Sequence, residues 1–450
     1  MWMPAIEHRP GPTAQRIVEA LAEAIDHGQL KTGAQLPPHR ELADRMRVSV
    51  GTVSRAYSLA KERGLITGTV GRGSFVAARA DEPEGPGREI DLTQNFIRWD
   101  PGESVAQLVR AAIRDRSDLR MLMEVYPDPA GRLEHRQSAA RWLARRGLAA
   151  SEQQIVLTNG AQHALFTVFA ALTRPGDWIA AEHLTYPGIK AIASQLALRV
   201  AGLAMDREGL LPEALDRLCT REKIRILYTI PTLQNPTGAL MSEDRRETIA
   251  DIARRRNIVI VEDDIYAFLV ESPPPPMAAF APERSYLVTG LSKGVFPGLR
   301  LGFAVTPPGG RDAVAGMVRM SLITVSPLAA AIGTSWLENR TADRIAEWKR
   351  MEIEWRWQMA SRFFGLDTHD AHFAAHLWLP LTQDPEQFVS RVRAKGVVLA
   401  AANVFSVSAE SVPSAVRICL GVPATRARLQ QALEVIADVL DGRPALAPFI

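Results

Sequence analysis

The sequence contains only two cysteines, Cys219 and Cys419, among its 450 residues. Two thiols give no disulfide framework, so we expect a reducing compartment, the cytoplasm. No apolar run approaches the roughly 18 residues that a membrane-spanning helix needs. The first ten residues also lack the apolar segment and cleavage site of a secretory signal. We therefore expect a soluble cytoplasmic protein with no membrane partner, and not a disulfide-stabilised secreted one.

A strong excess of charge of one sign is also missing, because the net charge is only +3. Hydrophobic residues at 47% and charged residues at 23% are ordinary globular values. A chain of 450 residues exceeds what one core usually organises, so at least two domains are expected. The first 79 residues hold 11 of the 53 basic residues and 7 of the 50 acidic ones. This local basic excess favours an N-terminal phosphate-binding module joined to a nearly neutral body.

Three helical patterns open the chain, and a short segment of alternating apolar residues around glycines follows at residues 65–76. That segment predicts a β-hairpin. Residues 80–90, which are rich in proline, glycine and acidic side chains, are the predicted linker. The predicted domains are therefore 1–79 and 91–450. Because the linker is short, we expect the two domains to pack closely.

The N-terminal pattern of helix, turn, helix and glycine-bearing hairpin is typical of a winged helix-turn-helix. We place the recognition helix at residues 50–63, with Thr52, Ser54 and Arg55 in its first turns as donors toward bases and phosphates. Arg40 opens the preceding helix, where phosphates lie. A winged domain that binds protein instead of DNA is the alternative.

Residues 36–57 (LPPHRELADRMRVSVGTVSRAY) and 64–76 (GLITGTVGRGSFV) resemble the GntR family of bacterial repressors. The resemblance implies binding to a double-stranded DNA operator. By that resemblance the residues that face DNA are Arg40, Ser49, Thr52 and Ser54, while Gly71 lets the wing approach the backbone. Val50 stands where many members of this family carry a basic residue, which leaves apolar contact with a thymine methyl group at that position.

Beyond the linker, apolar runs alternate with helical stretches, which indicates an α/β sheet layered by helices. A long amphipathic helix with Trp348, Trp355 and Trp357, followed by shorter strands, predicts a smaller C-terminal subdomain. We interpret the three tryptophans as core or dimer surface and not as a ligand cage. The seven predicted strands are residues 155–158, 178–182, 198–203, 224–230, 258–262, 286–291 and 301–306.

Lys293 is the predicted chemical centre of the body. A lysine that forms an imine must lose a proton and stand at a fixed place, typically in a loop after a strand. Ser292 precedes it, and Arg300 follows seven residues later, where a guanidinium can bind phosphate. Asp263 ends a predicted strand, and a buried carboxylate stays ionised there by pairing with a cation such as a protonated pyridine nitrogen.

Three further features complete a cradle for a phosphorylated pyridine aldehyde. Tyr266 follows Asp263 by three residues, and the amide of Asn235 can donate to a phenolate oxygen. Residues 160–162 fall where a predicted strand turns into a helix, so free N–H groups and the helix dipole favour a phosphate there. The spacing of these groups along the chain predicts one binding site.

Residues 120–306 resemble fold-type-I aminotransferases, which bind pyridoxal 5′-phosphate (PLP). The matching blocks occur in the order YPDPAG, TNGAQHAL, AEHLTYPG, PTLQNPTG, VEDDIY and LSKGVFPGLRLG. The resemblance implies a mixed, mostly parallel seven-stranded sheet with a smaller C-terminal subdomain. It also implies that Lys293 carries the Schiff base, with Asp263 and Tyr266 as the other catalytic groups.

The same resemblance assigns roles to the remaining site residues. Asn235 and Tyr266 bind the ring hydroxyl, and Tyr186 stacks on the ring. Tyr126 reaches the phosphate of the neighbouring subunit, which implies a homodimer. Arg417, in VRICLG, binds the α-carboxylate of an amino acid, unless it only closes a salt bridge. The phosphate is held by Ala161, Gln162, Ser292 and Arg300.

Two departures from the aminotransferase pattern are visible in the sequence. Gly290 stands where many members carry a hydroxyl residue, so one phosphate contact is missing or is taken over by Thr289. Residues 94–100 lack the usual glycine-containing pattern, and no contact to the substrate is carried over there.

With both resemblances on one chain, the protein is similar to the MocR subfamily of GntR regulators, which form head-to-tail dimers. This implies a PLP-dependent transcriptional regulator that senses a small amino compound, or PLP itself, through an internal aldimine on Lys293. The alternative is a working aminotransferase that uses an amino acid and a 2-oxo acid. A scaffold that has lost both ligands is disfavoured, because the site residues are all present. No metal site is expected.

Overall fold

The computed structural model describes residues 2–6, 11–26, 29–31, 33–62, 65–69, 73–77, 89–99, 104–114, 116–367 and 372–442. The chain forms two compact units, one of residues 1–88 with 100–110 and the other of residues 89–99 with 111–450. Most of the predicted linker lies outside the described residues, so close packing of the two domains stays a prediction. Ile90 was predicted as linker but begins strand β3 (Ile90–Asp91), because its buried side chain belongs to the core of the second unit.

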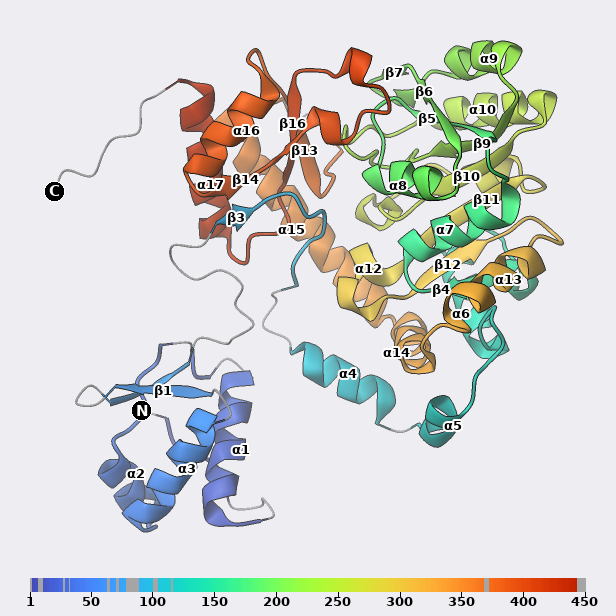
Figure 1. Ribbon diagram of the computed structural model, residues 1–450. Helices are drawn as coiled ribbons and strands as arrows, with labels where there is room; N and C mark the ends of the chain where they lie inside the picture. The colour runs from blue at the N-terminus through green and yellow to red at the C-terminus, as the bar shows by residue number, and fades with distance from the viewer. Residues whose placement is uncertain are drawn as a thin grey trace. The chain divides into compact units, whose positions relative to one another are not determined.

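The first unit contains the predicted winged helix-turn-helix, shown in blue in Figure 1. Apolar side chains at helical spacing, among them Ile17, Leu21, Leu42 and Val53, form its core. The hydroxyl of Tyr57 donates to the carbonyl oxygen of Pro37 at 2.9 Å and fixes the third helix to the start of the second. The elements are α1 (Thr13–Asp26), α2 (His39–Met46), α3 (Val50–Glu62) and the antiparallel pair β1 (Ile66–Thr69) and β2 (Gly73–Val76).

A seven-stranded sheet forms the centre of the second unit. Its order is β4-β12-β11-β10-β9-β5-β6, and β12 alone is antiparallel to both of its neighbours. All seven predicted strands are therefore confirmed in one mixed, mostly parallel sheet. The strands are β4 (Ile155–Thr158), β5 (Trp178–Glu182), β6 (Arg199–Leu203), β9 (Ile224–Thr229), β10 (Val259–Asp263), β11 (Ser285–Gly290) and β12 (Gly302–Val305).

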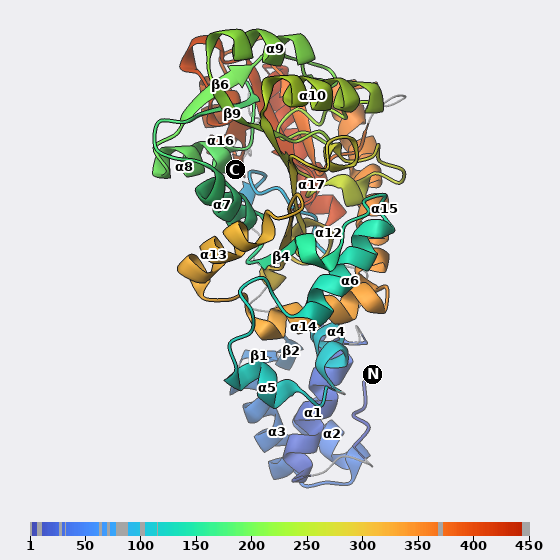
Figure 2. The ribbon, with the colours of Figure 1, turned by 90° about the vertical axis from the view of Figure 1, so that its right-hand side faces the viewer.

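Helices cover both faces of this sheet, which explains why its central strands are almost wholly buried. Figure 2 shows α7 (Ala161–Leu172), α8 (Pro187–Gln195) and α13 (Arg311–Leu322) on one side, with α6 (Leu133–Ala144) and α10 (Glu243–Arg256) on the other. Helix α4 (Val105–Ile113) lies mostly within the residues of the first unit. The remaining elements of the second unit up to this point are α5 (Leu119–Glu124), β7 (Met205–Asp206), β8 (Gly209–Leu210), α9 (Pro212–Arg221), α11 (Met277–Phe280), α12 (Leu291–Gly294) and α14 (Pro327–Glu338).

The smaller C-terminal subdomain begins with the predicted long helix, α15 (Thr341–Phe364). Its tryptophans pack against protein groups: Trp348 lies 5.1 Å from the ring of Trp99, and Trp357 donates to the carbonyl oxygen of Ala374 at 2.6 Å. These contacts agree with a core role for Trp348 and Trp357, whereas Trp355 is exposed, with the guanidinium of Arg426 over its ring. The other elements are β13 (His376–Pro380), α16 (Pro385–Ala394), β14 (Val397–Val398), β15 (Ala400–Ala401), β16 (Ala415–Cys419) and α17 (Arg426–Leu440).

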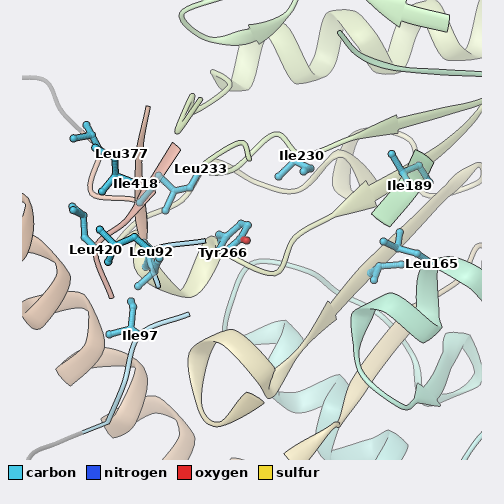
Figure 3. Close-up of a cluster of buried hydrophobic side chains, with 14 of the residues drawn as sticks. Leu92, Ile97, Leu165, Ile189, Ile230, Leu233, Tyr266, Leu377, Ile418 and Leu420 are labelled. Carbon is cyan, nitrogen blue, oxygen red and sulfur yellow. The ribbon is translucent and has the colours of Figure 1, made fainter. Parts of the chain in front are cut away.

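One buried apolar cluster joins the large sheet to the C-terminal subdomain. Figure 3 shows Leu92 and Ile97 beside Ile418 and Leu420, close to the ring of Tyr266. The segment around residue 95 is thereby fixed between the two parts of the second unit. None of the helices that the structure describes has the length and apolar character needed to span a membrane.

Candidate functional site around Lys293

A cavity of about 620 Å³ opens where several strands of the large sheet end. Its volume lies in the range of small-molecule sites, roughly 300–1,000 Å³. Ten of the eleven residues predicted for the cofactor and the substrate line it, although they come from segments far apart in the sequence. These ten are Ala161, Gln162, Tyr186, Asn235, Asp263, Tyr266, Ser292, Lys293, Arg300 and Arg417.

Asp263 provides a buried carboxylate with one free oxygen. It is the last residue of β10, and its Oδ2 accepts a hydrogen bond from the hydroxyl of Tyr228 at 2.9 Å. Its Oδ1 is buried and has no partner within the described residues. Burial raises the pKa of Asp263 to about 7. A cation beside Oδ1 would restore the ionised form, which is the partner that a protonated pyridine nitrogen needs.

The opposite end of the cavity is built to receive an anion. The first residues of α7 present free N–H groups and the positive end of the helix dipole. The hydroxyl of Ser292 is buried and has no partner within the described residues. Gly160 makes room for Arg300, because a Cβ at this position would lie 2.7 Å from the Nη2 atom of Arg300. These donors fit a phosphate group.

Of the two alternatives predicted for the phosphate contact near Gly290, replacement by Thr289 is wrong. The hydroxyl of Thr289 donates to the carbonyl oxygen of Asp264 at 3.2 Å, and the side chain is buried outside the cavity. Gly290 lines the cavity instead. A Cβ on Gly290 would lie 2.8 Å from the carbonyl oxygen of Leu301 and 2.9 Å from the Cα atom of Gly302. Backbone of β12 therefore occupies the space that a hydroxyl residue would need.

Lys293 lies in the short helix α12, which follows β11 directly, and not in the predicted loop. Its Nζ donates to the backbone oxygen of Asn95 at 2.5 Å. Burial lowers the pKa of Lys293 to about 8. A larger fraction of this amine is therefore neutral, and nucleophilic, than for an ordinary lysine at pH 7.

Asn95 is a site residue that the sequence did not predict. Its amide nitrogen lies 2.8 Å from the hydroxyl of Tyr266 and 2.8 Å from Nδ1 of His376. The Nε2 atom of His376 lies 3.1 Å from the carbonyl oxygen of Gln234. Because a carbonyl oxygen can only accept, Nε2 donates to it, and Nδ1 of the neutral ring accepts from Asn95. Burial lowers the pKa of His376 to about 3, which keeps the ring neutral. Asn95 follows two other polar residues, Thr93 and Gln94, so nothing in the local sequence singled it out.

Arg417 connects Asn235 to the segment around Thr93. Its Nη1 donates to Oδ1 of Asn235 at 2.7 Å, and its Nη2 donates to the backbone oxygen of Thr93 at 2.5 Å. The guanidinium lies 4.6 Å from the centre of the Phe405 ring. Among the described residues Arg417 forms no ion pair, so a simple salt bridge does not explain its position. Its charge is available to an anionic ligand.

The other two predicted tyrosines, Tyr186 and Tyr126, lie in different places. Tyr186 precedes α8, and its hydroxyl donates to Oε1 of Gln162 at 2.9 Å, so its ring forms one wall of the cavity. Tyr126 follows α5, is 78% exposed and does not line the cavity of its own chain. Its role across a subunit boundary stays a prediction.

The predicted DNA-facing residues lie on α2 and α3 of the first unit. Arg40 and Arg55 are exposed. The hydroxyl of Ser49 accepts from the backbone N–H of Thr52 at 3.1 Å, and therefore caps the N-terminus of α3. The hydroxyl of Ser54 lies 3.0 Å from Nδ1 of His39 in α2. Gly71 lies outside the described residues.

The comparison with family models agrees with both units. Residues 88–436 match the family "Aminotransferase class I and II". The chain belongs to this family. Residues 13–76 match "Bacterial regulatory proteins, gntR family". The chain is therefore a GntR-type DNA-binding regulator fused to a PLP-dependent aminotransferase-like domain, consistent with the MocR subfamily.

Relatives and solved structures share this organisation or its larger part. An uncharacterised HTH-type transcriptional regulator of Bacillus subtilis strain 168, YdeF, is 29% identical over 98% of this chain and 97% of its own. The vitamin B6 salvage pathway transcriptional repressor PtsJ of Salmonella typhimurium is 30% identical over 65% of this chain and 67% of its own. An archaeal alanine:glyoxylate aminotransferase superposes with a TM-score of 0.72 at 20% identity, covering 79% of this chain and 92% of its own, which shows the fold alone.

Proposed function

We propose that this protein is a transcriptional regulator in which the PLP-binding domain senses a small amino compound, or PLP itself, and changes how the N-terminal domain binds DNA. The observation that carries the proposal is the convergence of three groups on one cavity: the free Oδ1 of Asp263, the free hydroxyl of Ser292 and the amine of Lys293. The name of the relative PtsJ, a repressor of vitamin B6 salvage, supports PLP as one effector.

Different side chains of the cavity would bind different parts of PLP and of the effector. PLP, when bound, supplies an aldehyde that captures primary amines. Lys293 would provide the amine for this aldehyde, and Asp263 would hold a proton on the ring nitrogen. Asn235 and Tyr266 would donate toward the phenolic oxygen, while Tyr186 would cover one face of the ring. The carboxylate of an amino acid would lie at Arg417, and the phosphate at Ala161, Gln162, Ser292 and Arg300.

We further propose that the protein acts as a head-to-tail homodimer in the cytoplasm. Tyr126 supports the dimer, because its ring is highly exposed and lies outside its own cavity. In the second copy it would reach the phosphate end. Large apolar side chains are also exposed on α5 and at the end of α13, namely Met121, Met123, Met320 and Leu322. Such surfaces are typical of subunit contacts.

An effector can change DNA binding only if it binds two arrangements of the protein with different affinities. The exposed guanidinium groups of Arg40 and Arg55 support contact with DNA phosphates and base edges. Val50 is exposed at the start of α3, where it suits an apolar contact.

The experiment measures both ligands on the full-length protein. Purified protein with PLP should show a visible absorption band that Lys293→Ala abolishes and the exposed control Lys223→Ala retains. It should bind the DNA upstream of its own gene with an affinity that falls as salt rises. The slope of log affinity against log salt is negative, and Arg55→Ala should make it less steep by about 1. Lys61→Ala, at the far end of α3, should leave the slope unchanged. Absence of both the band and salt-dependent DNA binding would refute the proposal.

The second function, an aminotransferase, is favoured by one observation: Lys293, Asp263, Tyr266 and Arg417 all line the cavity. Steady turnover of an amino acid with a 2-oxo acid, at a rate that Lys293→Ala removes, would support it. A single half-reaction without turnover would instead support sensing.

A further inference from the structure

The cavity around Lys293 has a polar part and an apolar part. The polar part contains the groups assigned to PLP. Beyond Arg417 the wall changes character and consists of apolar side chains from the C-terminal subdomain: Val389, Leu399, Ala400, Ala401, Val404 and Phe405. No role in holding PLP is assigned to any of these six residues, so they are free to contact a second molecule.

Every charged side chain that lines the cavity already has a partner in the proposed function. Among the described lining residues these are Asp263, Lys293, Arg300 and Arg417. Asp263 serves the ring nitrogen, Lys293 the aldehyde, Arg300 the phosphate and Arg417 one carboxylate. A second carboxylate or an extra ammonium group on the effector would therefore enter the cavity without an opposite charge. Burying an unpaired charge is strongly unfavourable.

The apolar wall is packed against its neighbours at Phe405 and leaves space for a ligand. Phe405 is buried between the guanidinium of Arg417, 4.6 Å from its centre, and the ring of Trp378, 6.1 Å away. The small side chains of Ala400 and Ala401 keep the region in front of it open. Val404, 45% exposed, stands at the outer edge. A ligand held by Arg417 would place its side chain along Phe405.

We propose that the effector is an α-amino acid with an uncharged, apolar side chain, whose carboxylate lies at Arg417 and whose side chain contacts Leu399, Ala401, Val404 and Phe405. This inference rests on the proposed function, because it names the ligand class of the same site. Apolar pockets discriminate between side chains by roughly tenfold or more for each methylene group. Selectivity should therefore follow apolar size and not charge.

The test is a spectroscopic titration of the full-length protein loaded with PLP. The change in the visible band is followed with L-leucine, L-alanine, L-aspartate and L-lysine. Leucine is expected to reach half-saturation at a concentration about tenfold or more below that for aspartate or lysine, with alanine weaker than leucine. The readout is binding and does not require turnover.

A substitution in the apolar wall that changes the amino-acid preference provides a second test. Val404→Arg introduces a cation at the edge of the apolar wall and should move the preference toward aspartate by about tenfold or more. The matched control is Val412→Arg, at a position that is 36% exposed and does not line the cavity; it should leave the preference unchanged. An unchanged PLP band in both variants shows that the site is intact.

The outcomes separate this inference from the function on which it rests. Tighter binding of aspartate or lysine than of leucine by the wild-type protein would overturn the inference and leave the PLP-dependent regulator standing. The same holds if Val404→Arg and Val412→Arg behave alike. If no amino acid changes the band of the loaded protein, the inference fails together with the sensing of amino acids. Loss of the band itself in the wild type would instead refute the proposed function.

Discussion

Glu182 is a fully buried carboxyl group next to the segment that leads to Tyr186. It ends β5, and its Oε1 accepts hydrogen bonds from the hydroxyl of Thr229 at 2.5 Å and from the backbone N–H of Ile230 at 2.8 Å. Its Oε2 has no partner within the described residues. Burial raises the pKa of Glu182 to about 7 from an ordinary value of 4.5. The folded protein therefore binds this proton more tightly than the unfolded chain does.

Glu182→Gln should flatten the dependence of stability on pH. Because the folded-state pKa is above the unfolded one, the stabilising proton is fully present below pH 4.5 and is lost as pH rises through 7. The contribution of Glu182 to the free energy of unfolding should fall by up to about 3 kcal/mol from pH 5 to 8, so the pH dependence of the variant should be weaker than that of the wild type by about this amount. Urea unfolding followed by tryptophan fluorescence measures it, with the exposed Glu213→Gln as control. Equal pH dependence in wild type and Glu182→Gln would contradict the argument.

Residues that belong to a continuous motif could be predicted from the sequence, and residues defined only by distant partners could not. Ten predicted residues line the cavity because each stands in a recognisable block. Asn95 contacts Tyr266 across a separation of 171 residues, so no local pattern reveals it. Thr289 was misplaced because neighbouring residues of a strand point to opposite faces, and only Gly290 points into the cavity.

At the scale of elements, α15 supports the helix that carries Lys293. Lys349 of α15 is fully buried, and its Nζ donates to the backbone oxygen of Lys293 at 3.2 Å and to that of Val295. Burial, together with the charge of Lys293, lowers the pKa of Lys349 to about 7. A neutral amine still has two N–H donors, which match the two carbonyl oxygens. Lys349 is therefore a positioning residue for α12.

Lys349→Met should weaken PLP binding without unfolding the protein. The methionine keeps the length and the apolar contacts of the side chain but removes both donors to α12. We expect the Kd for PLP to rise about tenfold, or about 1.4 kcal/mol. The urea midpoint should change little, because removing the cost of burying the amine offsets the two lost hydrogen bonds. Titration of the visible band measures the Kd. The control is the exposed Lys223→Met, and an unaltered Kd in Lys349→Met would argue against positioning.

Long elements were predictable and very short ones were not. The seven apolar runs became the seven strands of the sheet because each is long enough to show its buried character. Helix α12 contains only four residues, which is about one helical turn. A pattern that repeats every 3.6 residues cannot be seen within one turn, so Lys293 was expected in a loop. The linker prediction extended to Ile90, because a two-residue strand leaves equally little trace.

At the scale of the whole molecule, the exposed apolar residues of the second unit indicate a surface that is covered in solution. Met320, at the end of α13, is 79% exposed, and Leu322 and Ile323 follow it on the surface. Monomeric proteins rarely expose such groups together. The proposed dimer would bury them, and would also bring Tyr126 of each copy to the cavity of the other.

The double variant Met320→Glu, Ile323→Glu should separate the dimer into monomers, because two carboxylates would have to be buried at the contact. Light scattering after gel filtration should give twice the chain mass of 49.4 kDa for the wild type and a single chain for the variant. Met351→Glu, at an exposed apolar position of α15, is the control and should remain dimeric.

The monomeric double variant should also bind PLP more weakly, since it lacks the second copy's tyrosine. Tyr126→Phe should reproduce that weaker binding while the mass stays that of a dimer, which separates loss of the hydroxyl from loss of the contact. A double variant that keeps the dimer mass would place the subunit contact elsewhere.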